Sequence, residues 1–203
     1  LDNKVHRVED VEDAVPAPEL GDIPTTGSKQ KLLIDESDNS NVAEAFRLLR
    51  TNVGFMLPRN KEGGQTIFIT STVGSEGKTF VAINLARSLT LINKRVLLIG
   101  ADIRKPKLAR YLEMEPETGL TNFLIDYQVQ VPDVVHRYKE TKLDVIPSGP
   151  IPPNPSELLT NGRFDEIMAW GREQYDYVIV DTAPVNIVTD TLLLGEQADL
   201  FVY

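Results

Sequence analysis

The sequence contains no cysteine and a single tryptophan among its 203 residues. Without cysteine, the chain has no disulfide framework, no thiolate metal site and no cysteine nucleophile, and its composition fits a reducing compartment. No apolar run approaches the roughly 18–20 residues that cross a bilayer, and no signal-peptide pattern opens the chain. We therefore expect this chain on its own to be soluble.

Positive charge is also scarce, because 21 Lys and Arg face 30 Asp and Glu, for a net charge of −9. This balance argues against a general nucleic-acid binder. The acids are unevenly spread: residues 1–40 hold 10 acids and 4 bases, whereas residues 41–203 hold 20 and 17. The sequence thus predicts an acidic arm over 1–40 and a nearly neutral folded domain over 41–203.

The arm contains prolines and glycines among charged residues. This pattern predicts a short helix near 5–15, an extended piece near 20–23 and a loop over 25–29. A helix is expected over 41–57, ending before Pro58, with a polar loop over 61–65. Its apolar residues recur at steps of three and four: Val42, Ala45, Phe46, Leu49, Val53 and Met56.

Beyond this helix, apolar strands alternate with helices. Strands are predicted over 66–71, 95–101, 143–147 and 176–181 and from about Leu200, and helices over 78–91, 163–174 and 185–197. Residues 106–139 read as mixed helix and loop, and Asn154 is placed to cap a helix that begins at Pro155. Buried strands separated by helices indicate an α/β fold, a doubly wound and mostly parallel sheet with helices on both faces.

The strongest local motif is a glycine-containing loop between a strand and a helix. Gly74 and Gly77 allow the backbone N–H groups to cradle phosphate, with Lys78 reaching the β- and γ-phosphates and Thr79 holding Mg²⁺. Thr72 stands where the standard pattern has glycine, so the match is deviant. A bare Gly-Lys-Thr is common by chance, but its place between an apolar strand and a helix predicts binding of ATP with Mg²⁺.

Two acids follow predicted strands, where a phosphate loop needs ligands for its metal. Asp102 follows the strand over 95–101, and Asp181 ends the strand over 176–181. Either alone could be a helix cap or turn residue, but beside a phosphate loop both are expected to be functional. The basic cluster Arg104, Lys105, Lys107 and Arg110 is either a solvated face or, for Arg104, a contact to phosphate or to a partner's acids.

Together these motifs resemble the cytoplasmic domain of bacterial tyrosine kinases of the Wzc and CapB type, within the deviant P-loop ATPases that include MinD and ParA. The resemblance covers nearly the whole chain, including the arm. It rests on the Walker A motif at 72–79, the Walker A′ box at 97–104, the Walker B strand at 178–184, the Glu-x-x-Arg-x-x-Arg helix at 44–52 and the segment 152–159.

This resemblance implies an ATP-dependent protein tyrosine kinase that autophosphorylates in trans and regulates capsular or exopolysaccharide biosynthesis and export at the cytoplasmic face of the bacterial inner membrane. Catalysis would rest on Lys78, Asp102 and Asp181, and Mg²⁺ would be held by Thr79, Asp102 and Asp181. The nucleotide would contact Val73, Gly74, Ser75, Glu76, Gly77, Lys78, Thr79, Phe80 and Arg104.

The resemblance also implies assembly and partners. Glu44, Arg47 and Arg50 lie along one side of a helix. Composition alone favours a local Glu–Arg ion pair there, whereas the resemblance implies that this face joins copies into a ring. Further expected partners are a transmembrane polysaccharide co-polymerase segment, in cis or in trans, and the tyrosine tail of a neighbouring subunit.

The chain departs from the family pattern in several places. Gly100 stands where the family has the first Asp of its Walker A′ box, an acid that would help to coordinate the metal or accept the tyrosine proton. Asp102 and Asp181 would then carry both roles, or the kinase would be slow. No tyrosine cluster is present, Tyr177 is expected in the core, and we expect the family domain to continue beyond Tyr203. Two alternatives stay open: a MinD/ParA-like ATPase, although Val73 replaces its signature lysine, and a nucleotide-gated scaffold that phosphorylates nothing.

Overall fold

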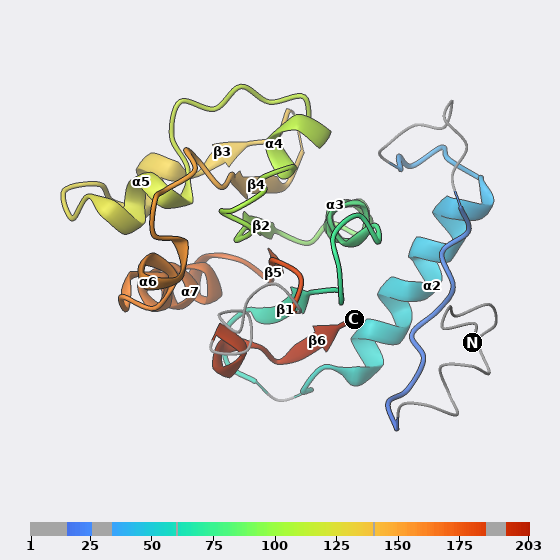
Figure 1. Ribbon diagram of the computed structural model, residues 1–203. Coiled ribbons are helices and arrows are strands. Elements are labelled where there is room, and N and C mark those ends of the chain that lie inside the picture. Colours follow the sequence, from blue (N-terminus) through green and yellow to red (C-terminus); the bar gives the residue numbers. More distant parts are fainter. Residues whose placement is uncertain (1–15, 26–33, 60, 140, 186–193) are drawn as a thin grey trace, which may run out of the picture.

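The computed structural model describes residues 16–25, 34–59, 61–139, 141–185 and 194–203. Within them, six strands form one sheet in the order β3-β4-β2-β5-β1-β6. Figure 1 views this sheet with helices on both sides. The strands are β1 (Gln65–Ile69), β2 (Val96–Gly100), β3 (His136–Arg137), β4 (Leu143–Ile146), β5 (Tyr177–Asp181) and β6 (Leu200–Val202).

All pairings in the sheet are parallel except that of β3 with β4. The predicted doubly wound, mostly parallel α/β sheet is therefore confirmed, and each of the five predicted strands is present. The antiparallel edge strand β3 was not predicted, because two residues are too short to show a period of two.

The central strands are apolar without interruption because both faces of the sheet are covered. All five residues of β2 are buried, and their side chains alternate between two cores. Leu98 points to the core that α3 covers, whereas Leu97 and Ile99 point to the core that α7 covers. Because β4, β2, β5, β1 and β6 are parallel, their carboxyl ends all lie at the same end of the sheet.

One face of the sheet is covered by α2 (Asn41–Met56) and α3 (Lys78–Leu91), as predicted to within one residue, with the short α4 (Leu108–Tyr111) beside them. Ser40 caps the N-terminus of α2, because its hydroxyl accepts the N–H of Ala43 at 3.2 Å. Phe46 of α2 meets Phe80 of α3 edge to face, with ring centroids 5.7 Å apart. This contact ties α2 to the helix that follows the phosphate loop.

The opposite face is covered by α5 (Leu120–Ile125), α6 (Pro155–Leu159) and α7 (Arg163–Gln174), with the 3₁₀ turn η1 (Val131–Val134) beside α5. The prediction for α7 is confirmed at both ends. Asn154 occupies the predicted cap position of α6, but its side chain bonds Glu157 instead of the helix backbone.

The helix predicted over 185–197 differs in its last turn, where Leu194–Gln197 forms the 3₁₀ turn η2. Gly195 lies there against the ring of Phe201, which keeps the chain close to β6. Residues 186–193 of that prediction lie outside the described residues, as do the predicted helix over 5–15 and residues 26–29 of the predicted loop.

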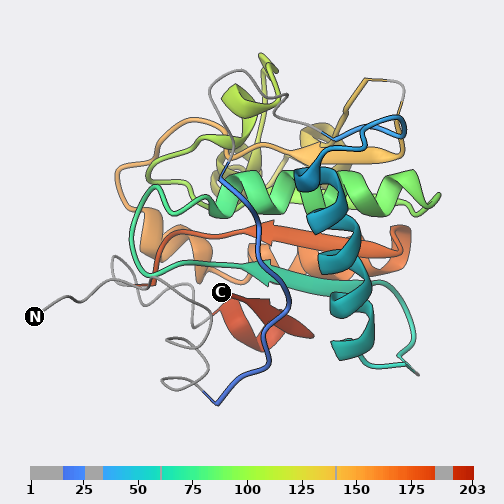
Figure 2. The same cartoon turned by 90° about the vertical axis from the view of Figure 1, so that its right-hand side faces the viewer.

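The described part of the arm lies against the domain. Leu20 and Ile23 pack on the core beneath α2, and Asn52 donates to the Leu20 carbonyl at 2.9 Å. Figure 2 shows residues 16–25 running beside α2. Ile34 is buried, and its N–H donates to Asn84 of α3. The division into an arm and a domain stays a prediction. No helix among the described residues is long and apolar enough to span a membrane.

Candidate functional site

The phosphate loop between β1 and α3 has the backbone of an anion cradle. Gly77 takes the left-handed conformation with φ of 97° just before α3, and Ser75 takes φ of 72°. Glu76 accepts the N–H of Val73 at 3.0 Å, and the Ser71 hydroxyl donates to the Val73 carbonyl at 2.9 Å. The loop is thus shaped by its own residues at the N-terminus of a 14-residue helix.

The four residues assigned to phosphate and metal chemistry converge behind this loop. Lys78 Nζ lies 3.3 Å from Asp102 Oδ2 and 3.4 Å from Asp181 Oδ1. The Thr79 hydroxyl donates to Asp181 Oδ2 at 2.8 Å. Residues 24 and 103 positions apart in the chain therefore share one buried cluster.

Strand pairing explains this convergence. Because β1, β5 and β2 are parallel neighbours, the loop after β1 and the acids after β2 and β5 meet at the same edge. The Asp181 carbonyl accepts the N–H groups of Ala101 and Asp102, at 2.9 and 3.1 Å, so the backbone fixes the two acids relative to each other.

The cluster holds more negative than positive charge. The side chains of Lys78, Asp102 and Asp181 are 8, 10 and 3% exposed. Burial raises the pKa of the Asp181 carboxyl, although Lys78 and the Thr79 hydroxyl act in the opposite direction, and the charge of Asp102 raises it further. Among the described residues, the Lys78 ammonium is thus the one cation in contact with both Asp102 and Asp181. Two carboxylates with one ammonium leave a net negative charge among oxygen atoms that can bind a metal cation.

This donor set fits Mg²⁺. A hydroxyl and carboxylates are the protein oxygens that Mg²⁺ uses, and it takes only one or two carboxylates with water and substrate phosphates. The described residues contain no group of three or more His, Cys, Asp or Glu that could enclose a metal by themselves. The site therefore suits a metal that arrives with a nucleotide better than a permanent structural metal.

The basic cluster contacts the loop and the segment before α6. Lys107 Nζ donates to the Ser75 hydroxyl at 3.3 Å, and Arg104 donates to the Ser156 hydroxyl at 2.5 Å. Neither pairing was predicted, because nothing in the sequence links residues 32 or 52 positions apart. Among the predicted nucleotide contacts, Val73 is exposed, whereas the Phe80 ring packs on Phe46.

Gly100, the departure in the Walker A′ box, is closely packed. A Cβ atom there would lie 2.8 Å from Ser148 Oγ and 3.1 Å from Leu108 Cδ2. The buried Ser148 hydroxyl also donates to the Gly100 carbonyl at 2.8 Å. Ser148 was missed by sequence reasoning, although its place just after the strand β4 was a usable signal. In this chain a serine occupies the space beside position 100 in which a longer side chain would have to lie.

The charged face of α2 makes contacts within the chain. Arg47 pairs with Glu44 and donates to the Asp38 carbonyl at 2.6 Å. Arg50 donates to the Ser88 carbonyl of α3 at 2.8 Å. The local ion pair that the spacing allowed is present, and Arg50 also holds α2 on α3. Tyr177, expected in the core, lies half-buried in β5 against that core.

Comparison with known proteins adds three findings. The family model described as an AAA domain matches residues 64–200. The chain is 39% identical over 180 residues to the putative tyrosine-protein kinase EpsB of Ralstonia solanacearum, covering 89% of this chain and 24% of that protein. It is 31% identical over 159 residues to the putative tyrosine-protein kinase CapB of Staphylococcus aureus, covering 78% of this chain and 68% of that protein.

Among solved structures, the chimerical protein CapA2B2 superposes with a TM-score of 0.85 at 35% identity, covering 96% of this chain and 83% of that one. The chain spans about a quarter of the length of the first curated relatives that it matches. The predicted resemblance is confirmed: the chain belongs to the bacterial tyrosine-protein kinase family, within the AAA domain family.

Proposed function

We propose that this member of the bacterial tyrosine-protein kinase family binds ATP with Mg²⁺ and transfers the γ-phosphoryl group to a tyrosine hydroxyl. The observation that carries the proposal is the buried cluster in which Lys78 and Thr79 of the phosphate loop meet Asp102 and Asp181. Phosphoryl transfer needs positioning and charge stabilisation more than covalent chemistry from the protein, and these residue types supply both.

Each residue has a distinct role in this proposal. The backbone of Gly74–Thr79 cradles the phosphates, and Lys78 neutralises the charge that develops on the transferred group. Thr79 and Asp181 would hold Mg²⁺, directly or through water, and Asp102 would contribute from the neighbouring strand end. Arg104, which donates to the Ser156 hydroxyl, would contact a phosphate or a partner's acid.

Asp102 is the proposed acceptor for the tyrosine proton. The phenol oxygen attacks the γ-phosphorus, the bond to the ADP oxygen breaks, and the phenol proton passes to the carboxylate. A tyrosine hydroxyl has a pKa near 10 in solution, so its acceptor must be well positioned and close to a cation. Lys78 lies 3.3 Å from Asp102 and provides that cation. Bound Mg²⁺ would supply further positive charge beside the β- and γ-phosphates.

The decisive experiment incubates the chain with ATP and Mg²⁺ and measures phosphotyrosine and released phosphate in parallel. We expect phosphotyrosine in the wild type and none in the Lys78→Met variant. Phosphate release without phosphotyrosine on the chain, or on an added poly-Glu-Tyr substrate, would favour the MinD/ParA-like ATPase. Neither product, with an oligomer that still responds to ATP, would favour the nucleotide-gated scaffold.

We also propose that copies assemble into a ring through the α2 face of Glu44, Arg47 and Arg50. Arg50→Ala is a poor test, because Arg50 bonds the Ser88 carbonyl and its loss loosens α2 itself. Arg47 is the better probe, and Arg110→Ala is its control, because it removes an exposed arginine from α4 and leaves the α2 face intact. Light scattering should find a smaller assembly for Arg47→Ala only; equal masses in wild type and Arg47→Ala would contradict the ring.

Membership of the same family also suggests where the kinase acts and with which partners. We propose that residues 1–40 are a lead-in from a membrane-bound polysaccharide co-polymerase segment, in cis or in trans, and that residues 41–203 are kinase domain. The kinase would then act at the cytoplasmic face of the inner membrane on the tyrosine tail of a neighbouring subunit, and phosphorylation would regulate capsule or exopolysaccharide export. Limited proteolysis tests the division, since we expect the first cuts before residue 41.

A further inference from the structure

A cavity of about 370 Å³ lies beside the amino ends of β2 and β5, at the side of the sheet opposite the phosphate loop. Arg95 precedes β2 and Tyr175 precedes β5, whereas Asp102 and Asp181 stand at the other ends of the same strands. A five-residue strand separates the two edges by roughly 16 Å. The volume falls in the range of small-molecule sites, about 300–1,000 Å³, and none of the proposed kinase chemistry uses it.

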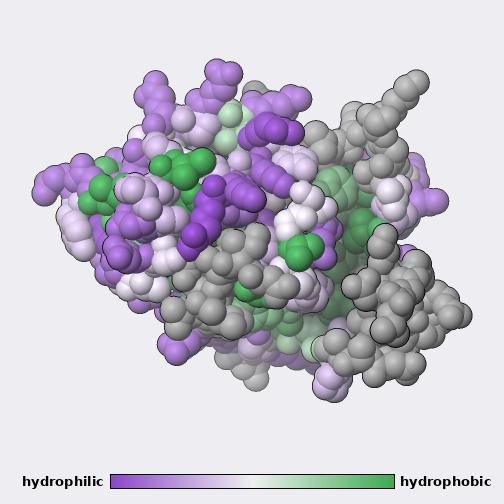
Figure 3. All heavy atoms as spheres, in the orientation of Figure 1, coloured by the Kyte–Doolittle hydropathy of each residue, from purple (hydrophilic) through white to green (hydrophobic). Residues whose placement is uncertain are grey.

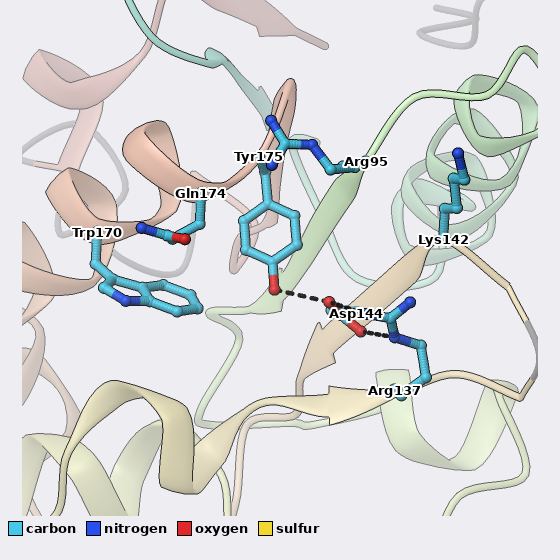
Figure 4. A pocket seen from close by; sticks show the side chains of 7 residues that line it. All are labelled: Arg95, Arg137, Lys142, Asp144, Trp170, Gln174 and Tyr175. Atoms are coloured by element: carbon cyan, nitrogen blue, oxygen red, sulfur yellow. Dashed lines mark hydrogen bonds and ion pairs between the residues drawn. The ribbon is translucent and has the colours of Figure 1, made fainter.

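One wall of this cavity is aromatic. Trp170, on α7, and Tyr175, just after it, meet edge to face with ring centroids 5.7 Å apart, and Gln174 lies between them (Figure 4). Tyr175 is held in place, because its buried hydroxyl donates to Asp144 at 2.8 Å. Arg137 in turn bonds the same carboxylate at 2.5 Å. The wall is therefore a fixed surface against which a planar ring can pack.

The remaining wall is cationic. Among the described residues, three cations line the cavity, Arg95, Arg137 and Lys142, and the one lining carboxylate is that of Asp144. Arg137 pairs with Asp144, whereas neither Arg95 nor Lys142 forms an ion pair with that carboxylate. Arg95 has an exposed side chain and a long 3.4 Å contact to Asp176, and Lys142 donates to Asn93, a neutral amide. A chain with a net charge of −9 thus presents an excess of positive charge at this cavity.

We propose that this cavity binds an aromatic phosphate, a planar ring that carries a phosphate ester. The ring would pack on Trp170 and Tyr175, and the phosphate would be reached by Arg95 and Lys142. An uncharged apolar ligand would leave the cations unused, and a bare phosphate would leave the aromatic wall unused. Free phosphotyrosine and nucleoside monophosphates share this chemistry. The proposal does not depend on the kinase activity.

The chain carries its own reporter, because Trp170 is its only tryptophan. Ligands that enter this cavity change the environment of the indole, whereas ligands in the phosphate loop bind at the far edge. The experiment titrates the 203-residue chain with phenyl phosphate, O-phosphotyrosine, AMP and inorganic phosphate and follows indole fluorescence. We expect saturable changes with the aromatic phosphates and much weaker binding of inorganic phosphate. Whichever of O-phosphotyrosine and AMP has the lower dissociation constant shows whether the ligand is a phosphorylated tyrosine or a nucleotide.

Paired variants locate the binding. Losing one charge-assisted hydrogen bond weakens binding by about tenfold, so Lys142→Gln and Arg95→Gln should each raise the dissociation constant by that factor. Arg137 is left intact, because its removal strands the buried Asp144 carboxylate. Arg110→Gln removes an exposed charge from α4, which follows the other end of β2, and should leave the affinity unchanged.

Three results would overturn the proposal. The first is no saturable fluorescence change with any aromatic phosphate at millimolar concentration. The second is equal affinity for phenyl phosphate and inorganic phosphate, which removes the role of the aromatic wall. The third is unchanged affinity in the Arg95→Gln/Lys142→Gln double variant when thermal unfolding shows that it is folded. A chain that binds phenyl phosphate but makes no phosphotyrosine would retain this site and lose the kinase assignment.

Discussion

The hydroxyl of Thr79 donates to the carboxylate of Asp181 over 2.8 Å, joining the first turn of α3 to the last residue of β5 across 102 positions of the chain. Both residues are buried. The bond holds two side-chain oxygens together beside the phosphate loop. A cation held by both oxygens would replace this hydrogen bond without moving either main chain, which is the usual benefit of a preorganised site.

The first prediction follows from this bond. Thr79→Val keeps the shape of the side chain and removes the hydroxyl, so the Mg²⁺ dependence of tyrosine phosphorylation should shift to higher concentration and the rate should fall about 10–100-fold. Thr79→Ser keeps the hydroxyl and is the matched control. Initial rates measured across a Mg²⁺ series check this, and overlapping Mg²⁺ curves for wild type and Thr79→Val would contradict the assigned role.

The second prediction concerns pH. Burial raises the pKa of Asp181 above its ordinary value of 3.8, so the folded chain binds this proton more tightly than the unfolded chain does. The stability that Asp181 contributes is then full below pH 3.8 and is lost as the pH rises through its folded pKa. Asp181→Asn removes this dependence. Unfolding measured from pH 4 to pH 8 should show the free energy of the wild type falling relative to the variant; a difference constant with pH contradicts the assignment.

Sequence patterns were sufficient for the main elements and the centre of the site. The helices over 78–91 and 163–174 have both ends as predicted, and a glycine in the left-handed conformation stands just before each. Lys78, Asp102 and Asp181 could be placed together from sequence because parallel strands end at one edge. That argument needs the strands to be parallel neighbours in one sheet, but it needs no knowledge of any side-chain contact.

Contacts between distant loops could not be predicted. Ser148 reaches the Gly100 carbonyl, and Lys107 reaches Ser75, across 48 and 32 positions. These bonds depend on how loops of irregular length fold back at the strand ends, and no periodic pattern encodes that. The cavity lined by Arg95 and Tyr175 could not be predicted for the same reason. Its lining comes from four separate segments of the chain, and each segment by itself resembles an ordinary solvent-exposed surface.

The third prediction tests the packing at Gly100. A methyl group there meets Ser148 Oγ at 2.8 Å and Leu108 Cδ2 at 3.1 Å, so Gly100→Ala should cost about 1–3 kcal/mol of the free energy of unfolding. Ser148→Ala removes the closest atom, and the double variant should recover part of the loss, a coupling that a double-mutant cycle measures. Additive effects of the two changes in urea unfolding would show that Ser148 does not limit this position.

The fourth prediction concerns Arg163, a cation at the start of α7 whose side chain is only 7% exposed. Its guanidinium donates to the carbonyls of Phe123, Asp126 and Val129 at 3.0, 3.2 and 2.9 Å and lies 3.7 Å from the Phe123 ring centroid. Arg163→Met leaves these carbonyls without that donor and should cost about 3–5 kcal/mol. Glu166, its partner on the solvent side, is 56% exposed, so Glu166→Gln should cost less than about 1 kcal/mol. Urea unfolding of the two variants measures the free energy that each change costs. Similar losses of unfolding free energy in both would mean that the surface ion pair stabilises the turn after α5, and that the bonds to the carbonyls do not.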